Sequence, residues 1–145
     1  MTKMVWNDSR SIGVDEIDTQ HKDFIRLINR LQIMHEMKAS RHLVLRLLME
    51  LAKFWEFHFT SEENLMIIAR YPGFEHHRRC HLQVLETLND RYKSFETGGA
   101  EINSIIDILK EWLDDHIRNV DKLAGQFINK IAHDRSCVDL SSPSV

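Results

Sequence analysis

The sequence predicts an all-α protein, namely an antiparallel up-down four-helix bundle with a non-helical N-terminal arm and a C-terminal extension. Three observations lead to this prediction. Residues that break helices are rare, since the 145 residues include only two prolines and five glycines. Apolar residues recur at helical spacing along four long stretches. Pro72-Gly73 and Gly98-Gly99 lie between stretches, so the connections are short and consecutive helices should run antiparallel.

The first two helices are expected over residues 19–37 and 41–69. Asp18 and Thr19 are suitable N-cap residues for the first helix, because their side-chain oxygens can accept hydrogen bonds from free backbone N–H groups. The apolar residues at helical spacing are Phe24, Ile25, Ile28, Leu31 and Met34 in the first helix and Leu47, Leu48, Leu51, Phe54, Trp55, Phe59, Leu65 and Met66 in the second. Tyr71-Pro72-Gly73 ends the second helix.

The third helix is expected over residues 74–96, and Gly98-Gly99 stops it. The fourth begins at about residue 101 and continues through His116 and beyond. The apolar residues at helical spacing are Leu82, Val84, Leu85, Leu88 and Phe95 in the third helix and Ile102, Ile105, Ile106, Leu109, Trp112 and Leu113 in the fourth. These two helices complete the predicted bundle.

The chain is long enough for one domain with a substantial core, which we place in residues 1–133. Residues 1–18 are expected to form the non-helical arm, with Trp6 packed on the bundle. Residues 134–145 are expected to be a polar C-terminal tail.

Composition excludes several classes of partner. The net charge is −3 and the sequence pI is about 6.3, and the basic residues are spread along the chain, so neither nucleic acid nor an anionic membrane is an expected partner. No apolar run is long enough to span a bilayer, and the first residues lack the pattern of a secretory signal. We therefore expect a cytoplasmic protein. Its two cysteines are interpreted as free thiols, with Cys80 a small packing residue.

Histidine and carboxylate residues occur at spacings that suit metal binding. His58 and Glu62 are four residues apart in the second helix, as are His77 and His81 in the third, so each pair shares one helix face. The first and fourth helices each add further candidates. The complete set of candidate metal ligands is His21, His58, Glu62, His77, His81, His116 and Asp121. All four helices thus contribute to the predicted site.

The number of candidate ligands indicates two metal ions. Five imidazoles and two carboxylates exceed the four ligands of a structural zinc site and suit a pair of octahedral ions. Carboxylates can bridge two cations, and nitrogen and oxygen donors without thiolate favour iron or manganese over copper(I) or an iron–sulfur cluster. A non-haem dimetal centre follows, with iron preferred.

Taken singly, each histidine is more simply read as a hydrogen-bonded core residue, and the pair His58 and Glu62 as a helix surface contact. Taken together they make coincidence the weaker explanation, and His58 and Glu62 both fall on the apolar stripe of the second helix. The remaining histidines lack partners at ligand spacing and are not expected to be ligands. They are His35, His42, His76 and His133.

The spacing of His116 and Asp121 does not suit a regular helix. Five residues rotate two side chains by about 140° from each other, so both cannot point inward. We therefore predict a wide or π-like turn between them. Regular α-helical hydrogen bonding, with Asp121 facing solvent, would contradict a bridging role for this residue.

The motifs together resemble those of the bacterial hemerythrins. They are Trp6, GVDEID at 13–18, QHK at 20–22, HFTSEE at 58–63, YPGFEHHRRCH at 71–81 and HIRNVD at 116–121. The resemblance extends from about residue 5 to about residue 127. It implies that residues 1–133 form a di-iron domain with two non-haem, oxo- or hydroxo-bridged irons. His77, His81 and His116 would hold one iron, His21 and His58 the other, and Glu62 and Asp121 would bridge them.

The resemblance also implies the activity. In this family dioxygen binds reversibly, as hydroperoxide, at the open position of the iron with two histidines. The expected function is oxygen storage, delivery or sensing without enzymatic turnover, and sensing would need a separate recipient or signalling protein. The alternatives are a di-iron redox enzyme or iron-handling protein that consumes peroxide or nitric oxide, and a metal-free helical interaction module. The residues expected to line an apolar oxygen pocket are Phe24, Phe59, Leu113 and Ile117.

Overall fold

The computed structural model describes residues 2–138, and for residues 135–138 the backbone alone. Its four long helices are α1 (Asp15–Glu36), α2 (Arg41–Ala69), α3 (Phe74–Glu96) and α4 (Ile102–His116). The helix α4 continues without a break through η2 (Ile117–Asp121), a π-helix, into α5 (Lys122–Val138). The described residues contain no strand, so the all-α prediction is confirmed.

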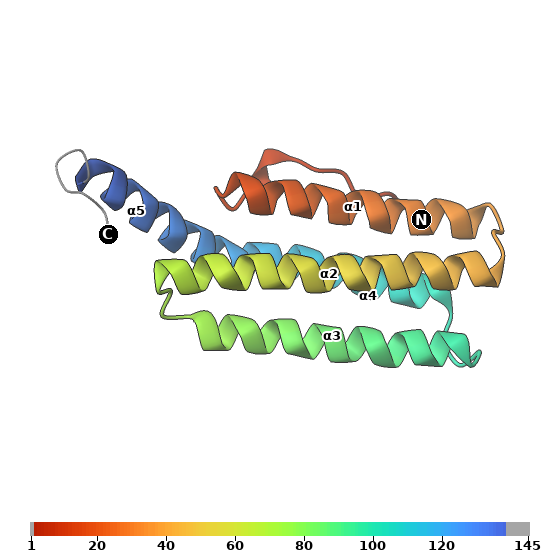
Figure 1. The fold of residues 1–145 in the computed structure, drawn as a ribbon. Helices are drawn as coiled ribbons and strands as arrows, with labels where there is room; N and C mark the ends of the chain where they lie inside the picture. Colours follow the sequence, from red (N-terminus) through yellow and green to blue (C-terminus); the bar gives the residue numbers. More distant parts are fainter. Residues whose placement is uncertain (1, 139–145) are drawn as a thin grey trace.

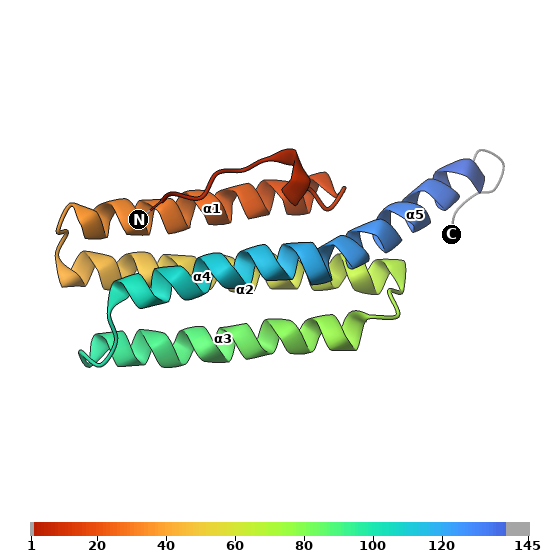
Figure 2. The same cartoon turned by 180° about the vertical axis from the view of Figure 1, so that it is seen from behind.

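The helices form the predicted antiparallel bundle. Each of α1, α2 and α3 packs against the next helix in the chain, and α4 closes the bundle by contacting both α3 and α1. Figures 1 and 2 show this up-down arrangement from opposite sides, with α5 extending beyond one end of the bundle. No helix among the described residues is long and apolar enough to cross a membrane.

The bounds of α2 and α3 agree with the predicted ranges. The Ser40 side chain accepts a hydrogen bond from the backbone N–H of Leu43 and so caps the start of α2. The helix ends where Arg70 adopts a left-handed conformation with φ of 56°, which is a common helix terminus. Gly73 then directly precedes α3.

The prediction of a non-helical arm over residues 1–18 is wrong in part. The segment Asp8–Arg10 is a short 3₁₀ helix, and α1 begins at Asp15 rather than at residue 19. Three acidic residues in its first turn favour this earlier start, since they lie at the positive end of the helix dipole. The Asp18 carboxylate does not cap the helix. It instead accepts hydrogen bonds from the hydroxyl of Ser11 and the backbone N–H of Ile12.

The first part of the predicted polar tail, residues 134–138, is helical. The helix α5 continues to Val138, because the sequence from 134 to 138 contains neither proline nor glycine to stop it. The rest of the predicted tail, residues 139–145, lies outside the described residues.

The N-terminal arm lies along α1 and is fixed to it. Backbone groups of Met4 exchange two hydrogen bonds with the Asn29 side chain, at 2.9 and 2.8 Å. Trp6 packs on the core, as predicted, with the ammonium of Lys22 5.1 Å from its ring centroid. The arm therefore covers one side of the bundle.

The end of the arm crosses the rod formed by α4, η2 and α5. The Lys122 ammonium donates to the carbonyl of Ser9 at 2.6 Å, and Arg10 pairs with Asp114. Gly125 lies directly against the backbone of Ile12, where any side chain would overlap the Ile12 carbonyl oxygen. The arm therefore contacts this helical segment both before η2, at Asp114, and after it, at Lys122 and Gly125.

Candidate metal centre

Seven polar side chains meet in the core of the bundle. Their exposed fractions are 0% for His21, 1% for His58, 0% for Glu62, 1% for His77, 1% for His81, 3% for His116 and 0% for Asp121. They come from α1, α2, α3, α4 and the end of η2. The structure thus brings together every residue that the sequence predicted as a ligand.

Three imidazoles form one half of the cluster. The Nε2 atom of His116 lies 3.2 Å from Nε2 of both His77 and His81. The i,i+4 spacing of His77 and His81 on α3 gives them one face, with ring centroids 4.6 Å apart. Their ring nitrogens point to a common centre, which is the arrangement a single cation requires.

Two imidazoles form the other half. The rings of His21 on α1 and His58 on α2 have centroids 4.8 Å apart. Nε2 of His21 lies 3.1 Å from Oδ2 of Asp121, and Nε2 of His58 lies 3.5 Å from Oε2 of Glu62. This half therefore offers two nitrogen donors where the first offers three.

The two carboxylates lie between the halves and touch both. Asp121 places Oδ1 3.0 Å from Nε2 of His77 and directs its other oxygen to His21. Glu62 lies 3.3 Å from Nε2 of His77 and 3.5 Å from Nε2 of His58. Each carboxylate thus has oxygens near both groups of imidazoles, as bridging ligands do.

The predicted irregular turn is confirmed. Residues Ile117–Asp121 form a π-helix, in which backbone hydrogen bonds span five residues instead of four. The wider turn absorbs the extra residue between His116 and Asp121, so both side chains are buried and face the cluster. The distance from Nε2 of His116 to Oδ1 of Asp121 is 2.9 Å.

Burial and contact set the protonation of the metal-free cluster. Burial lowers the pKa of His58 from 6.5 to about 3, against the opposing charge of Glu62. Burial also disfavours a charge on His77, but its contacts with Asp121 and Glu62 outweigh that effect and raise its pKa to about 9. Burial acts to raise the pKa of Asp121, yet His116 and neighbouring imidazoles hold it well below its ordinary value.

The unsatisfied atoms of the cluster indicate what it binds. Both oxygens of Glu62, both oxygens of Asp121 and both nitrogens of His21 are buried without a well-directed hydrogen bond. Buried polar atoms of this kind are costly, and two carboxylates at close range repel each other. Cations placed among them would satisfy these atoms. Imidazole and carboxylate donors without thiolate suit iron or manganese, so the residues fit a dimetal centre.

Two further residues contact imidazoles of the cluster through the outer ring nitrogen, Nδ1, since Nε2 faces the other ligands. His58 donates from Nδ1 to the amide oxygen of Gln20 at 2.7 Å, and His81 donates from Nδ1 to a carboxylate oxygen of Glu63 at 3.2 Å. The sequence interpretation missed both residues. The sequence does contain a signal for them, because Gln20 directly precedes the predicted ligand His21 and Glu63 directly follows the predicted ligand Glu62.

Apolar and aromatic side chains enclose the cluster. The residues predicted to line an oxygen pocket are buried, with exposed fractions of 0% for Phe24, 2% for Phe59, 1% for Leu113 and 2% for Ile117. Phe59 stacks on the ring of His81 at 3.8 Å, and Phe24 meets His58 edge-on at 5.1 Å. Trp112, which the sequence interpretation did not assign to the site, stacks on His116 at 4.3 Å.

The residues predicted not to be ligands lie outside the cluster. His42, His76 and His133 are exposed and His35 is partly exposed, and none belongs to either group of potential ligands among the described residues. Cys80 is half-buried, and its sulfur lies 3.9 Å from Nε2 of His76 rather than near the imidazoles of the site.

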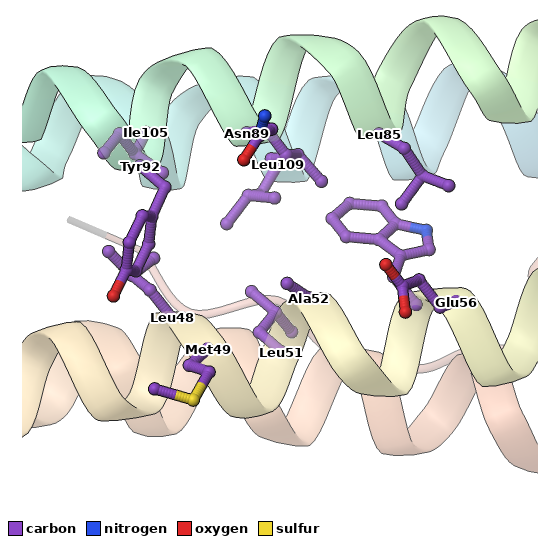
Figure 3. A pocket seen from close by; sticks show the side chains of 12 residues that line it. Leu48, Met49, Leu51, Ala52, Glu56, Leu85, Asn89, Tyr92, Ile105 and Leu109 are labelled. Carbon is purple, nitrogen blue, oxygen red and sulfur yellow. The ribbon is translucent and has the colours of Figure 1, made fainter.

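An apolar cavity of about 310 Å³ lies between α2, α3 and α4. It is nearer to the start of α2 and the end of α3 than the ligand cluster is. Figure 3 shows its walls, with Leu48, Leu51 and Ala52 of α2 facing Leu85 and Tyr92 of α3. Few polar groups line it, so it offers no ligand set for a metal. Trp55 belongs to its wall and also packs against Phe24.

The fold and the site together define a class: a four-helix bundle protein whose buried cluster of five imidazoles and two carboxylates fits a non-haem dimetal centre. The family model described as "Hemerythrin HHE cation binding domain" matches residues 12–128. The chain therefore belongs to the hemerythrin family.

Individual relatives agree with this assignment. The chain is 31% identical over 122 residues to a bacteriohemerythrin of Stenotrophomonas maltophilia, covering 84% of this chain and 79% of the relative. It is 32% identical to a bacteriohemerythrin of Methylococcus capsulatus, covering 86% and 96%. A crystal structure of wild-type hemerythrin superposes with a TM-score of 0.78 at 30% identity, covering 88% of this chain and 98% of that one.

Proposed function

We propose that this protein binds dioxygen reversibly at two iron ions held by the seven clustered side chains, and that it serves oxygen storage, delivery or sensing. Membership of the hemerythrin family makes it a di-iron, oxygen-binding protein rather than an enzyme. The observation that carries the residue assignment is the position of Glu62 and Asp121, each of which contacts both groups of imidazoles.

The two ends of the cluster supply unequal numbers of donors. His77, His81 and His116 would hold one ion, and His21 and His58 would hold the other. If both carboxylates were shared, the first ion would have five donors from the protein, three nitrogens and two oxygens. The second would have only four, two nitrogens and two oxygens. We assign the dioxygen position to the second ion, because it has the larger vacancy in an octahedral shell.

When bound, the two ferrous ions supply the electrons for dioxygen binding. Burial keeps the imidazole of His58 in the unprotonated form that can bind a cation, whereas His77, in which burial is outweighed by contacts with Asp121 and Glu62 that raise its pKa to about 9, would release a proton when a metal binds. Imidazole donors in place of further carboxylates support the ferrous state, because anionic oxygen ligands favour more oxidised iron. The buried side chains of Phe24, Leu113 and Ile117 exclude water from the site.

An oxygen cycle tests the proposal. The iron-loaded protein is reduced without oxygen, exposed to oxygen, and then returned to low oxygen pressure while its absorption spectrum is followed. Recovery of the starting diferrous spectrum over several cycles supports reversible binding. Rapid, irreversible oxidation together with consumption of added peroxide would show the alternative, a di-iron redox enzyme. Iron analysis of the purified protein excludes the metal-free alternative if two ions are found per chain.

A cytoplasmic location, an oxygen-transport role and a separate recipient or signalling protein stay predictions from the sequence. The oxygen pressure at which the protein releases its oxygen helps to distinguish storage from sensing. A storage protein must release oxygen within the pressures at which its host lives. A sensor instead requires the liganded and unliganded forms to differ at the surface.

A further inference from the structure

The outer nitrogens of two imidazoles are held by different chemical groups. Gln20, on α1, holds His58, and Glu63, on α2, holds His81. In each case the acceptor stands next to a ligand of its own helix, since Gln20 precedes His21 and Glu63 follows Glu62. The acceptor then reaches across to an imidazole on the neighbouring helix. The two contacts therefore join α1 to α2 and α2 to α3 at the metal centre.

The two acceptors differ in charge. The amide of Gln20 is neutral, whereas an ionised Glu63 carries a full negative charge. A carboxylate that accepts the outer N–H of an imidazole increases the basicity of the ring and makes it a stronger electron donor to a metal. A neutral amide oxygen fixes the ring orientation with a much smaller electronic effect. The half of the cluster with three imidazoles thus receives extra negative charge that the other half lacks.

We propose that Glu63 is a positioning residue that acts through His81 to favour the oxidised state of the iron held by three histidines. The inference rests on the proposed function, because it assumes iron at the seven-residue site. Oxygen binding withdraws electrons from both irons. Glu63 therefore supports oxygen binding from the side of the centre opposite to the vacancy, without contacting dioxygen or iron.

The surroundings of Glu63 leave its charge directed at His81. Its side chain is 22% exposed, so solvent screens it only in part. Among the described residues it forms no ion pair with a lysine or arginine, and His81 is its ion-pair partner. One face of the His81 ring is covered by Phe59, which stacks on it at an interplanar angle of 8°. The ring is therefore fixed in the orientation that this contact requires.

The test compares Glu63→Gln, which retains an acceptor oxygen but removes the charge, with Glu63→Ala, which removes both. The readouts are the reduction potentials of the iron-loaded protein by spectroelectrochemistry and the iron affinity by competition with a chelator. For Glu63→Gln we expect about a tenfold shift of one redox equilibrium toward the ferrous state, or about 59 mV for one electron. For Glu63→Ala we also expect iron affinity to fall by about 10-fold or more.

The matched control is Glu56→Gln, which removes an equal charge from the exposed face of α2 without touching a ligand. Its potentials should lie close to those of the unaltered protein. Gln20→Glu is the converse variant, and it should shift a potential in the opposite direction by placing a carboxylate on His58. If Glu63→Gln changes the potentials no more than Glu56→Gln does, the contact is structural only and the inference is wrong.

Failure of the inference can be told apart from failure of the proposed function. If the unaltered protein does not take up two irons per chain, the proposed function itself fails. If it does so and cycles reversibly with oxygen while Glu63→Gln keeps the original potentials, only the role of Glu63 is refuted. Circular dichroism of each variant checks that the helices remain folded.

Discussion

His116 and Asp121 are five residues apart on one continuous helical rod, yet Nε2 of the first lies 2.9 Å from Oδ1 of the second. A regular helix would separate their directions by about 140°. The π-helix between them reduces this separation, and the carboxylate lies next to the imidazoles of His77 and His116. The irregular turn is therefore a direct requirement of the site, and α4 and α5 are regular on either side of it.

Asp121→Asn is expected to weaken iron binding by at least about tenfold, because it preserves the shape of the side chain but removes one of two shared charges. Iron content after gel filtration in the presence of a weak chelator measures the effect. Asp107→Asn makes the same change on the exposed face of α4 and should retain the full iron content. Equal iron content in both variants would rule out a bridging role for Asp121.

The metal-free protein should be most stable near pH 6.5. Burial lowers the pKa of His58 to about 3, so its contribution is complete above its unfolded pKa of 6.5 and is lost as pH falls toward 3. The contribution of His77 to stability changes with pH in the opposite direction. Although burial disfavours its charge, contacts with Asp121 and Glu62 raise its pKa to about 9, so its contribution is complete below 6.5 and is lost as pH rises through 9.

Urea unfolding of the metal-free protein between about pH 5 and pH 9 measures this dependence. The depressed pKa values of Glu62 and Asp121 act in the same direction as that of His58, since their contribution is lost only as the pH falls. His77→Gln should flatten the alkaline side of the stability curve and leave the acidic side sloping. A curve that rises steadily up to pH 9 would contradict the assignment of His77.

Leu113→Ala and Leu109→Ala remove the same atoms from α4, one turn apart. Both leucines are fully buried, so each variant should lose about 2–5 kcal/mol of unfolding free energy. Only Leu113 is predicted to line the oxygen pocket. Its truncation should admit water and speed irreversible oxidation of the oxygenated protein several-fold, as followed by the decay of the oxygenated spectrum. Equal decay rates in the two variants would remove Leu113 from the pocket.

Gly125→Ala tests the contact between the N-terminal arm and α5. The added methyl group would overlap the carbonyl oxygen of Ile12, and a backbone atom cannot move aside as a flexible side chain can. Overpacking of this kind costs about 1–3 kcal/mol, which exceeds the gain of about 1 kcal/mol that alanine brings to a helix. We expect a lower midpoint of thermal unfolding. Ala132→Gly, at an exposed position of the same helix, supplies the reference for helix propensity alone.

Most of the buried cluster could be predicted from the sequence, because helical spacing determines which side chains of one helix share a face. His58 with Glu62 and His77 with His81 each follow the four-residue rule. Even the π-helix was predictable, since the five-residue spacing of His116 and Asp121 excludes a regular helix if both are ligands.

The parts that were predicted wrongly depend on contacts that helical periodicity does not encode. Asp18 has the side chain of an N-cap residue, but its carboxylate instead accepts hydrogen bonds from Ser11 and Ile12 of the N-terminal arm. Gln20 and Glu63 were missed for a related reason. Their partners lie on other helices, and the direction in which they point depends on how the helices pack.

The metal centre also affects how the protein unfolds. Through Asp121 and His21, iron would connect the first helix to the end of the π-helix, so that residues 21–121 lie within one closed loop. Such a closure restricts the unfolded chain much as a long-range disulfide does. Release of the metal should therefore precede global unfolding, and the lifetime of the native protein would be set by how slowly its iron departs.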